Sequence, residues 1–342
     1  MLTKNENIDS VMESVVREYI HSASPVSSQK IVDKYQLKVS PATVRNIMNR
    51  LEEAGLLTQP HTSAGRIPTN AGYRYYIDTL LKGKKLSPNR RDKLDMILEG
   101  APGDLEYLLD LTARLLGKYS DELGIALSPL FLEAVLEKVE IVELSNDRYL
   151  LVLEMEGGMV KTLMVESSKI LEKRHLPRLA GFLNEQMLRK SLSQIIELLE
   201  QFFDYSDAGD YHLVHQISLG LQSAMTPRLF ASDSLSFISR HNEDWGDNID
   251  MRQLIKNDSW IWKLRNHAAG QNSPVQIVFG DELDFPYGSN CAAIFHEYHI
   301  GRLKGFLAVF GPSHMDYSRI IPLVGYLSKT LSRKIYNNRK DY

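Results

Sequence analysis

Residues 40–74 of the chain are SPATVRNIMNRLEEAGLLTQPHTSAGRIPTNAGYR, and this stretch predicts the fold of the N-terminal part. Ser40 is a good helix N-cap, and Pro41 suits the first helical position, where a missing backbone amide leaves no partner unpaired. Gly55 is placed to end the helix in a left-handed conformation. We therefore expect a helix from Ser40 to Gly55, followed by two short strands around a loop rich in Gly, Ser, Thr and Pro.

The expected helix has two different faces. One face is an apolar stripe at helical spacing, made of Val44, Ile47, Met48 and Leu51. The opposite face has the small, amide and guanidinium side chains that pair with base edges and phosphates in a major groove. Its members are Ala42, Thr43, Arg45, Asn46, Asn49 and Arg50. Glu52 and Glu53 follow at the far end, where we expect the contact with DNA to stop.

The flanking segments complete a small module. Helices are predicted over residues 5–21 and 27–35, and a fourth helix is expected after the N-cap Thr69. The two short strands are expected at 56–59 and 66–68. This order of parts is typical of a winged helix-turn-helix, and the alternative is an ordinary small α/β module with polar outer faces.

The predicted DNA contacts come from the third helix and the loop after it. We expect Thr43 and Asn46 to meet base edges and Arg50 a phosphate, with the loop along the backbone or in the minor groove. The candidate DNA-binding residues are Ser40, Thr43, Arg45, Asn46, Asn49, Arg50, His61, Ser63 and Arg66. The alternative for Asn46 and Asn49 is that they simply face solvent.

Composition limits the class of protein. The 342 residues exceed one ordinary core, so two or three domains are expected. No apolar run is long enough to span a membrane, and no secretory signal is evident at the N-terminus. The single cysteine, Cys291, suits a reducing compartment, so we expect a cytoplasmic protein with no membrane partner.

Positive charge is concentrated near the predicted DNA-binding helix. The whole chain has a net charge of -3, yet between Lys30 and Arg74 seven lysine and arginine residues stand against three acidic ones. A small basic face on a weakly acidic body suits a protein whose affinity for DNA is local and salt-dependent.

The rest of the chain alternates between strand and helix patterns. Residues 82–93 are basic and without apolar periodicity, which favours a solvated linker over a phosphate contact. A helix is predicted over 104–119 and an antiparallel meander over 135–165, with turns at Asn146-Asp147 and Gly157-Gly158. Further predictions are helices over 170–229 and 250–267, strands at 275–279, 292–296 and 305–310, and a last helix over 317–336.

This order has two interpretations. Either one sensor-like α+β domain contains a helical insertion, or a helical domain separates two unrelated sheets. We place the self-contact of a dimer in the helical block, since one small head covers too little DNA for tight binding. The alternative is that these helices only cover their own sheet.

Two features of the sequence resemble enzyme motifs but do not indicate an active site. His296-Glu297-Tyr298-His299 lies in a predicted strand, which sends its two histidines to opposite faces and lacks the helical spacing of a zinc protease motif. Cys291 has no activating neighbour in sequence and is expected to be a buried structural thiol. We therefore predict no catalytic residue, no metal ligand and no cofactor.

The chain resembles the heat-inducible transcription repressor family, HrcA. The resemblance is carried by residues 19–40, by SPATVRNIMNRLEEAGLLTQPHTSAGRIPTNAGYRYYIDTLL over 40–81, and by GRLKGFLAVFGPSHMDYSRIIPLVGYLSKTLS over 301–332. Ser24 and Ser27 stand where the family commonly has glycine, and the middle of the chain matches only loosely.

The resemblance implies the domain plan of an α+β multidomain protein. It assigns residues 1–81 to a winged helix-turn-helix, 82–103 to a basic linker, 104–169 to the first part of a GAF-like domain, 170–230 to a helical inserted dimerisation domain, and 231–342 to the second GAF-like part.

It also implies a homodimeric repressor of chaperone operons. This repressor would bind an inverted-repeat operator in double-stranded DNA, depend on a chaperonin for its active form, and lose activity on heat stress. The alternatives are a winged-helix metabolic regulator whose GAF-like domain senses a small molecule, and an enzyme with an appended DNA-binding head.

Overall fold

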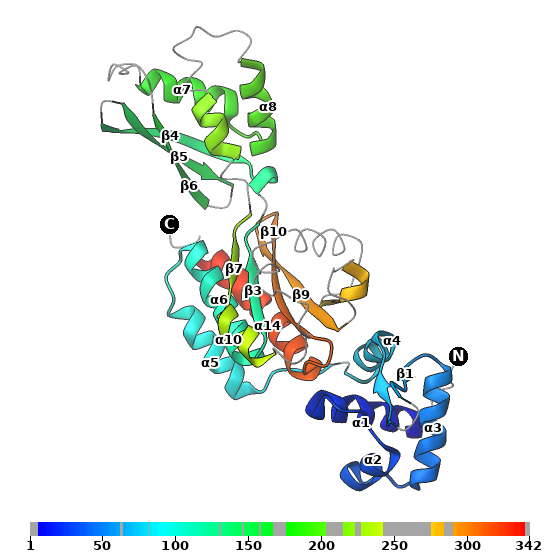
Figure 1. The fold of residues 1–342 in the computed structure, drawn as a ribbon. Helices are drawn as coiled ribbons and strands as arrows, with labels where there is room; N and C mark the ends of the chain where they lie inside the picture. Colours follow the sequence, from blue (N-terminus) through cyan, green and yellow to red (C-terminus); the bar gives the residue numbers. More distant parts are fainter. Residues whose placement is uncertain are drawn as a thin grey trace.

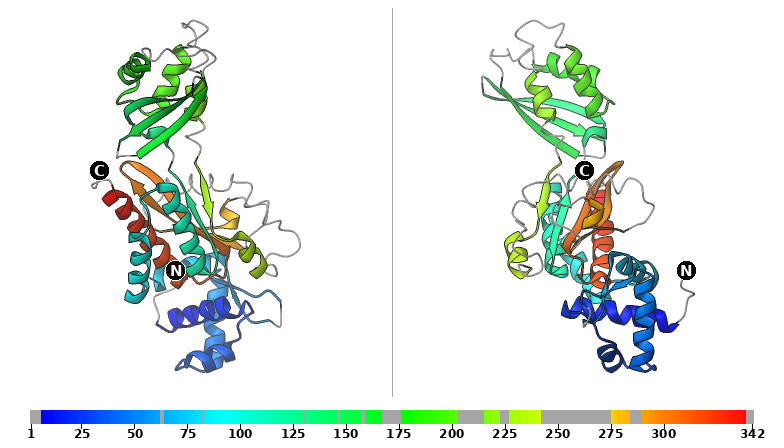
Figure 2. Two further views of the ribbon diagram at one scale, coloured as in Figure 1. Left: turned by 90° about the vertical axis from the view of Figure 1, so that its left-hand side faces the viewer. Right: turned by 45° about the vertical axis from the view of Figure 1, so that its right-hand side comes forward.

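The computed structural model describes residues 6–61, 64–81, 83–129, 131–145, 147–156, 159–166, 176–202, 215–222, 227–241, 275–283 and 290–338. The protein is a mixed α+β molecule with three parts stacked along one long axis (Figures 1 and 2). We call them the head, the core and the inserted unit, which comprise the described residues within 6–81, within 83–128 and 227–338, and within 131–222 respectively. Within the described residues, no helix is long and apolar enough to cross a membrane.

The head consists of helices and one small hairpin. Its elements are α1 (Glu6–Ser22), α2 (Ser28–Tyr35), α3 (Pro41–Glu53), β1 (Leu57–Thr58), β2 (Ile67–Pro68) and α4 (Asn70–Tyr75), which continues as the π-helical turn η1 (Tyr76–Leu80). The strands are antiparallel, with Leu57 opposite Pro68. The expected N-caps are confirmed, since the hydroxyls of Ser27, Ser40 and Thr69 each accept a backbone amide of the following turn.

Helix α3 has the predicted two-faced character. Val44, Ile47, Met48 and Leu51 are buried, which confirms the apolar stripe. Gly55 has the expected positive φ, 73°. The amides of Gly55 and Leu56 donate to the carbonyls of Glu52 and Leu51, both at 2.9 Å. This is a Schellman ending, and it turns the chain directly into β1.

The core is built on a five-stranded sheet. Its strands are β3 (Leu123–Leu127), β7 (Leu229–Ala231), β8 (Gln276–Phe279), β9 (Cys291–Ile300) and β10 (Leu303–Pro312). The sheet order is β7-β3-β10-β9-β8, and every neighbouring pair is antiparallel. The other core elements are α5 (Pro88–Glu99), α6 (Leu105–Ser120), α10 (Ser234–Arg240), the 3-10 turn η3 (Gly280–Leu283) and α14 (Tyr317–Asn338).

Helices cover both faces of this sheet. Along β9, Ala292 and Ile294 pack with the cluster that includes α14, whereas Ala293 and Phe295 pack with Phe237 of α10. Because successive strand residues point to opposite faces, one apolar run serves two separate cores. Figure 1 shows α5, α6 and α14 layered together on one side of the sheet.

The sequence pattern did not identify the strands at which the core sheet begins and, after the insertion, resumes. The strand that begins it is β3, which the sequence interpretation did not assign. The strand that resumes it after the insertion is β7, which starts at the end of the block expected to be helical. Both are short and flanked by helices, and a five-residue apolar run such as LGIAL has no periodicity that separates a buried strand from a helix end.

The inserted unit is a second α+β structure. It contains the 3-10 turn η2 (Phe131–Glu133), strands β4 (Leu136–Ser145), β5 (Arg148–Met155) and β6 (Met159–Glu166), and helices α7 (Leu176–Met187) and α8 (Leu192–Phe202), with further helical residues at 215–222. The meander is confirmed, but its sheet is separate from that of the core. The insertion is therefore not purely helical, and the meander belongs with α7 and α8.

The segment expected to be a linker also differs from expectation. Residues 88–99 of the predicted linker form α5, with Leu94 and Leu98 buried. The hydroxyl of Tyr326 in α14 donates to the Asp95 carboxylate at 2.7 Å. Polar contacts with α14 thus supplement the two buried leucines, which fits the weak apolar periodicity of this helix. The helix predicted over 250–267 and the Gly157-Gly158 turn lie outside the described residues.

Candidate nucleic-acid interface

The outer face of α3 projects away from the rest of the head. Thr43, Arg45, Asn46 and Arg50 are exposed on it. Among the described residues, no hydrogen bond or ion pair engages the side chains of Arg45, Asn46 or Arg50. An amide between two guanidinium groups on one exposed helical face can pair with a base edge while its neighbours meet phosphates.

Ser40 and Thr43 form the beginning of this face. The Ser40 hydroxyl accepts the Thr43 amide at 3.2 Å, and the two hydroxyl oxygens lie 3.0 Å apart. Ser40 is therefore occupied in capping the helix, and the Thr43 hydroxyl is held in place beside it. Pro41 has no backbone amide, and the amides of Thr43 and Val44 both donate to Ser40, so the backbone of this first turn offers little to a phosphate and the side chains must make the contact.

Asn49 and Arg66 lie together rather than facing outward separately. The Arg66 guanidinium donates to the Asn49 side-chain oxygen at 3.0 Å and forms an ion pair with Glu52 at 2.8 Å. Both Asn49 and Arg66 are half-buried. In this structure the two residues join the hairpin to α3.

The base of the hairpin is also fixed on its other side. Val26, in the connection between α1 and α2, exchanges two backbone hydrogen bonds with Arg66, both at 2.9 Å. A Cβ on Gly65 would lie 2.3 Å from the Val26 carbonyl oxygen, so only glycine fits this approach. His61 is exposed at the tip of the loop, while Ser63 lies outside the described residues.

Fewer positive charges of the head are free to meet DNA than the number of lysine and arginine residues in the sequence suggests. Lys30 and Lys34 form ion pairs with the buried Glu18 at 2.8 and 2.7 Å. Arg66 pairs with Glu52, and Arg74 with Glu282 of the core. Among the described residues, the cations from that stretch that no ion pair holds are Lys38, Arg45 and Arg50, at the start and along the outer face of α3.

Lys38 was therefore missed as a candidate contact. A count over residues 30–74 could not separate it from Lys30 and Lys34, because the acid that neutralises those two lies outside that range. The carboxyl of Glu18 is buried, which opposes its charge, but hydrogen bonds and charge from Lys30 and Lys34 outweigh this and lower its pKa to about 2.

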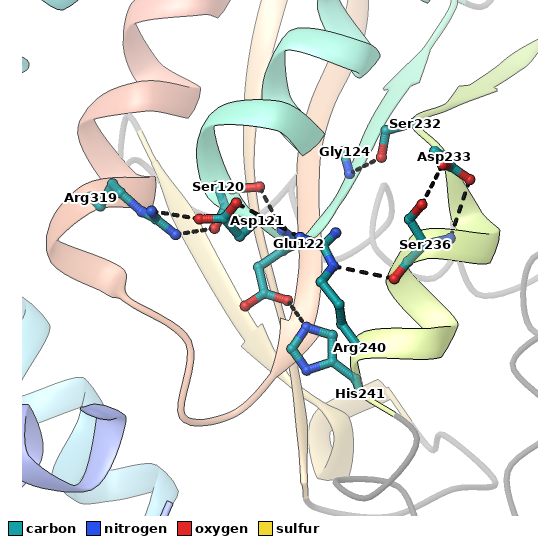
Figure 3. A network of polar contacts seen from close by, with 10 residues as sticks. All are labelled: Ser120, Asp121, Glu122, Gly124, Ser232, Asp233, Ser236, Arg240, His241 and Arg319. Carbon is teal, nitrogen blue, oxygen red and sulfur yellow. Dashed lines mark hydrogen bonds and ion pairs between the residues drawn. The ribbon is translucent and has the colours of Figure 1, made fainter. Parts of the chain in front are cut away.

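A second polar cluster lies in the core, around a cavity of about 940 Å³ between α6 and α10 (Figure 3). Glu122 lies 2.9 Å from His241, and burial raises the pKa of its carboxyl. Asp121 pairs with Arg319 at 2.7 Å, and Asp233 caps α10. The acidic groups of this cluster thus have partners within the chain, and the network ties α10 and α14 to the start of β3.

Among the described residues, no group of histidine, cysteine and acidic side chains is arranged to hold a metal ion. His296 and His299 lie on β9, half-buried and exposed respectively. Cys291 is buried, and burial raises its thiol pKa to about 12. A thiol with so high a pKa is a poor nucleophile.

Comparison with known proteins shows the family to which the chain belongs. Residues 106–321 match the model described as the HrcA protein C terminal domain. The heat-inducible transcription repressor HrcA of Geobacter sulfurreducens is 31% identical over 94% of this chain and 96% of its own length. The repressor of the same name from Shouchella clausii is 30% identical over 98% of both chains.

A solved structure described only as a hypothetical protein has the same fold. It superposes with a TM-score of 0.68 over 98% of this chain and 99% of its own, at 22% sequence identity. The matches above define the class: a transcription repressor of the heat-shock response. Within that class, the chain belongs to the HrcA family.

Proposed function

We propose that the head is a winged helix-turn-helix and that α3 enters the major groove of double-stranded DNA. The observation that carries this proposal is the exposed face of α3, on which Arg45, Asn46 and Arg50 have no partner among the described residues. Helix α2 precedes α3 as in a helix-turn-helix, and the β1–β2 hairpin is the wing. The core would then be the GAF-like domain of the family plan.

The residues of this face have different proposed roles. Asn46 reads a base edge, and Thr43 contacts the same groove. Arg45, Arg50 and Lys38 contact phosphates, and His61 and Ser63 lie along the wing. Asn49 and Arg66 act differently from the sequence-based expectation, because their hydrogen bond sets the angle between wing and helix.

The test compares operator and scrambled DNA. Asn46→Ala is expected to lose about 1–3 kcal/mol of discrimination between them while retaining non-specific affinity. Arg50→Ala is expected to weaken binding to both DNA sequences alike. It should also reduce the slope of log affinity against log salt concentration by about one. Fluorescence anisotropy at several salt concentrations measures both effects. If Asn46→Ala discriminates as well as the unmodified protein, the assigned face of α3 is wrong.

We place the homodimer contact on the three-stranded sheet of the inserted unit, instead of on its helices. Helices α7 and α8 use their buried residues, among them Leu183 and Ile195, within the unit. On the open face of the sheet, Val142, Leu144, Val160 and Met164 are exposed. Val142, Leu150 and Met164 stand opposite one another across the three strands.

A second copy of the chain is the occupant that this face suits. The face is apolar at its centre and has charged residues such as Lys138 and Glu140 toward one end, the pattern of a self-complementary interface. Two heads held in this way can engage the two halves of an inverted repeat. This arrangement supports a dimeric repressor, and the proposal that it acts on chaperone operons rests on the family resemblance.

Dependence on a chaperonin and loss of activity on heating complete the proposal, and both rest on the family resemblance. The test is to refold the denatured protein with and without chaperonin and then to titrate operator DNA. A larger active fraction with chaperonin is expected, and equal fractions would contradict this part alone.

A further inference from the structure

The head contacts the core through aromatic side chains of two helices. The Tyr73 ring of α4 is buried and lies 5.3 Å from the Tyr317 ring and 6.1 Å from the Phe279 ring, between centroids. On α1, Tyr19 meets His314 edge-on at 6.1 Å. Tyr73 is thus inserted between the end of β8 and the first residue of α14.

Polar contacts surround the Tyr73 ring on the side of β8. The Asn70 amide donates to Asp281 at 2.9 Å. Arg74 pairs with Glu282, and its guanidinium lies 5.2 Å from the centre of the Phe279 ring. Glu282 also accepts the Phe279 amide at 2.9 Å, so the same carboxylate holds the turn after β8 and the cation of the head. We call these six residues the clamp: Asn70, Tyr73, Arg74, Phe279, Asp281 and Glu282.

The core side of the clamp is the edge of the sheet. Strand β8 has four residues, 276–279, and among the described residues it pairs on one side only, with β9. By contrast, the ten residues of β10 pair with β9 along their whole length. A short edge strand has fewer hydrogen bonds to break, so it opens at a lower free energy than the centre of the sheet.

We propose that the clamp positions the head for operator binding, and that opening of β8 on heating releases the head while the centre of the core remains folded. This inference rests on the proposed DNA binding. It makes Tyr73 and Arg74 positioning residues, which touch no DNA and act by fixing the angle of the head. A released head loses the fixed geometry through which two heads bind one inverted repeat together.

Charge reversal tests the positioning role in the full chain. Arg74→Glu and Glu282→Arg are each expected to lower operator affinity at least about tenfold, because two like charges then meet at the clamp. The double variant Arg74→Glu/Glu282→Arg is expected to recover most of that loss. A matched control is Arg114→Glu, which breaks the ion pair with Asp110 on the exposed side of α6 and should leave affinity unchanged.

Circular dichroism and the melting temperature confirm that each variant is folded, and Asp281→Ala supplies a milder variant if a reversal unfolds the chain. Folded single variants with unchanged operator affinity would overturn the clamp and leave the proposed function standing, as would a double variant that does not recover. An unmodified protein that protects no inverted repeat would instead overturn the proposed function.

Release on heating has its own test. Hydrogen exchange is expected to show amides 276–279 losing protection at a lower temperature than those of β3 and β10, together with the loss of operator binding. Joining Asn70→Cys to Asp281→Cys with a short bismaleimide should keep binding to a higher temperature. The single-cysteine variants treated with the same reagent are the control. If the cross-linked and uncross-linked proteins lose operator binding at the same temperature, the release step is wrong.

Discussion

Glu18 shows how one buried carboxylate can organise the head. Its side chain is 1% exposed, and it receives Lys30, Lys34 and the Tyr35 hydroxyl, the last at 3.3 Å. These contacts join α1 to α2 and remove two cations from the basic surface. Because the lysines are nearly half-exposed, solvent screening weakens these ion pairs. We place their contribution to the free energy of unfolding at about 1–2 kcal/mol.

Glu18→Gln is expected to lower the melting temperature of the head near neutral pH. The folded pKa of about 2 lies below the ordinary value of 4.5. The stabilisation is therefore fully present above pH 4.5 and is lost as the pH falls toward 2. The variant should lack this acid-dependent loss. Glu13→Gln, which removes an exposed ion pair with Arg17, is the control and should melt like the unmodified protein.

Gly65→Ala tests the close approach at the base of the hairpin. The added Cβ would collide with the Val26 carbonyl, so the backbone bridge between Val26 and Arg66 must shift. We expect a loss of about 2 kcal/mol or more in the stability of the head, together with weaker operator binding. Gly181→Ala places a methyl group in open space on α7 and should leave the protein as stable or slightly more stable, because alanine favours a helix. Matching melting curves for the two variants would contradict this account.

At the scale of elements, the two faces of the β4–β6 sheet differ in what covers them. Tyr149, Leu151, Leu153 and Met155 of β5 are buried on the face that α7 and α8 cover. The alternating residues point to the other face, where four large apolar side chains are exposed. Exposed apolar area of this kind usually marks an interaction site.

Charge placed on the open face should separate the proposed dimer. Val142→Lys and Met164→Lys are each expected to convert a dimer into a monomer, because two lysines would be buried across a two-fold axis without partners. Glu197→Lys on α8 is the control and should leave the mass unchanged. Light scattering after gel filtration gives the mass directly, and a dimer in both lysine variants would refute the assigned interface.

At the scale of the whole molecule, the inserted unit is joined to the core at a narrow neck. β3 and β7 pair with Leu127 opposite Leu229. The Ser128 amide donates to the Arg228 carbonyl at 2.9 Å, and the Arg228 amide to the Ser128 hydroxyl at 2.8 Å. The two ends of the insertion therefore already form the last pair of a ladder, as the strands of a hairpin do.

Replacing residues 129–227 by Asn-Gly should leave the head and core folded. The short turn suits a two-residue hairpin between Ser128 and Arg228. The shortened chain is expected to be a monomer with nearly unchanged melting of the core, and with reduced operator affinity because one head binds alone. An unfolded product, or a shortened chain that still dimerises, would show that the insertion does more than join two copies.

Local signals account for what could be predicted. The N-caps Ser27, Ser40 and Thr69, the left-handed Gly55 and the apolar stripe of α3 all act within a few residues, so their sequence context is sufficient. The long strands β4–β6, β9 and β10 were predicted for the same reason. The exposed positions of Thr43, Arg45, Asn46 and Arg50 follow directly from the helical period.

The sequence by itself thus determined the head, the faces of α3 and the family resemblance. Only the tertiary structure decided that β3 and β7 begin and resume the core sheet, that Glu18 neutralises Lys30 and Lys34, and that Asn49 holds Arg66. It also decided that Arg74 faces Glu282, 208 positions later. The physical reason is range: caps and periodicity are properties of neighbours in the chain, whereas ion pairs and edge strands depend on which distant segments the fold brings together.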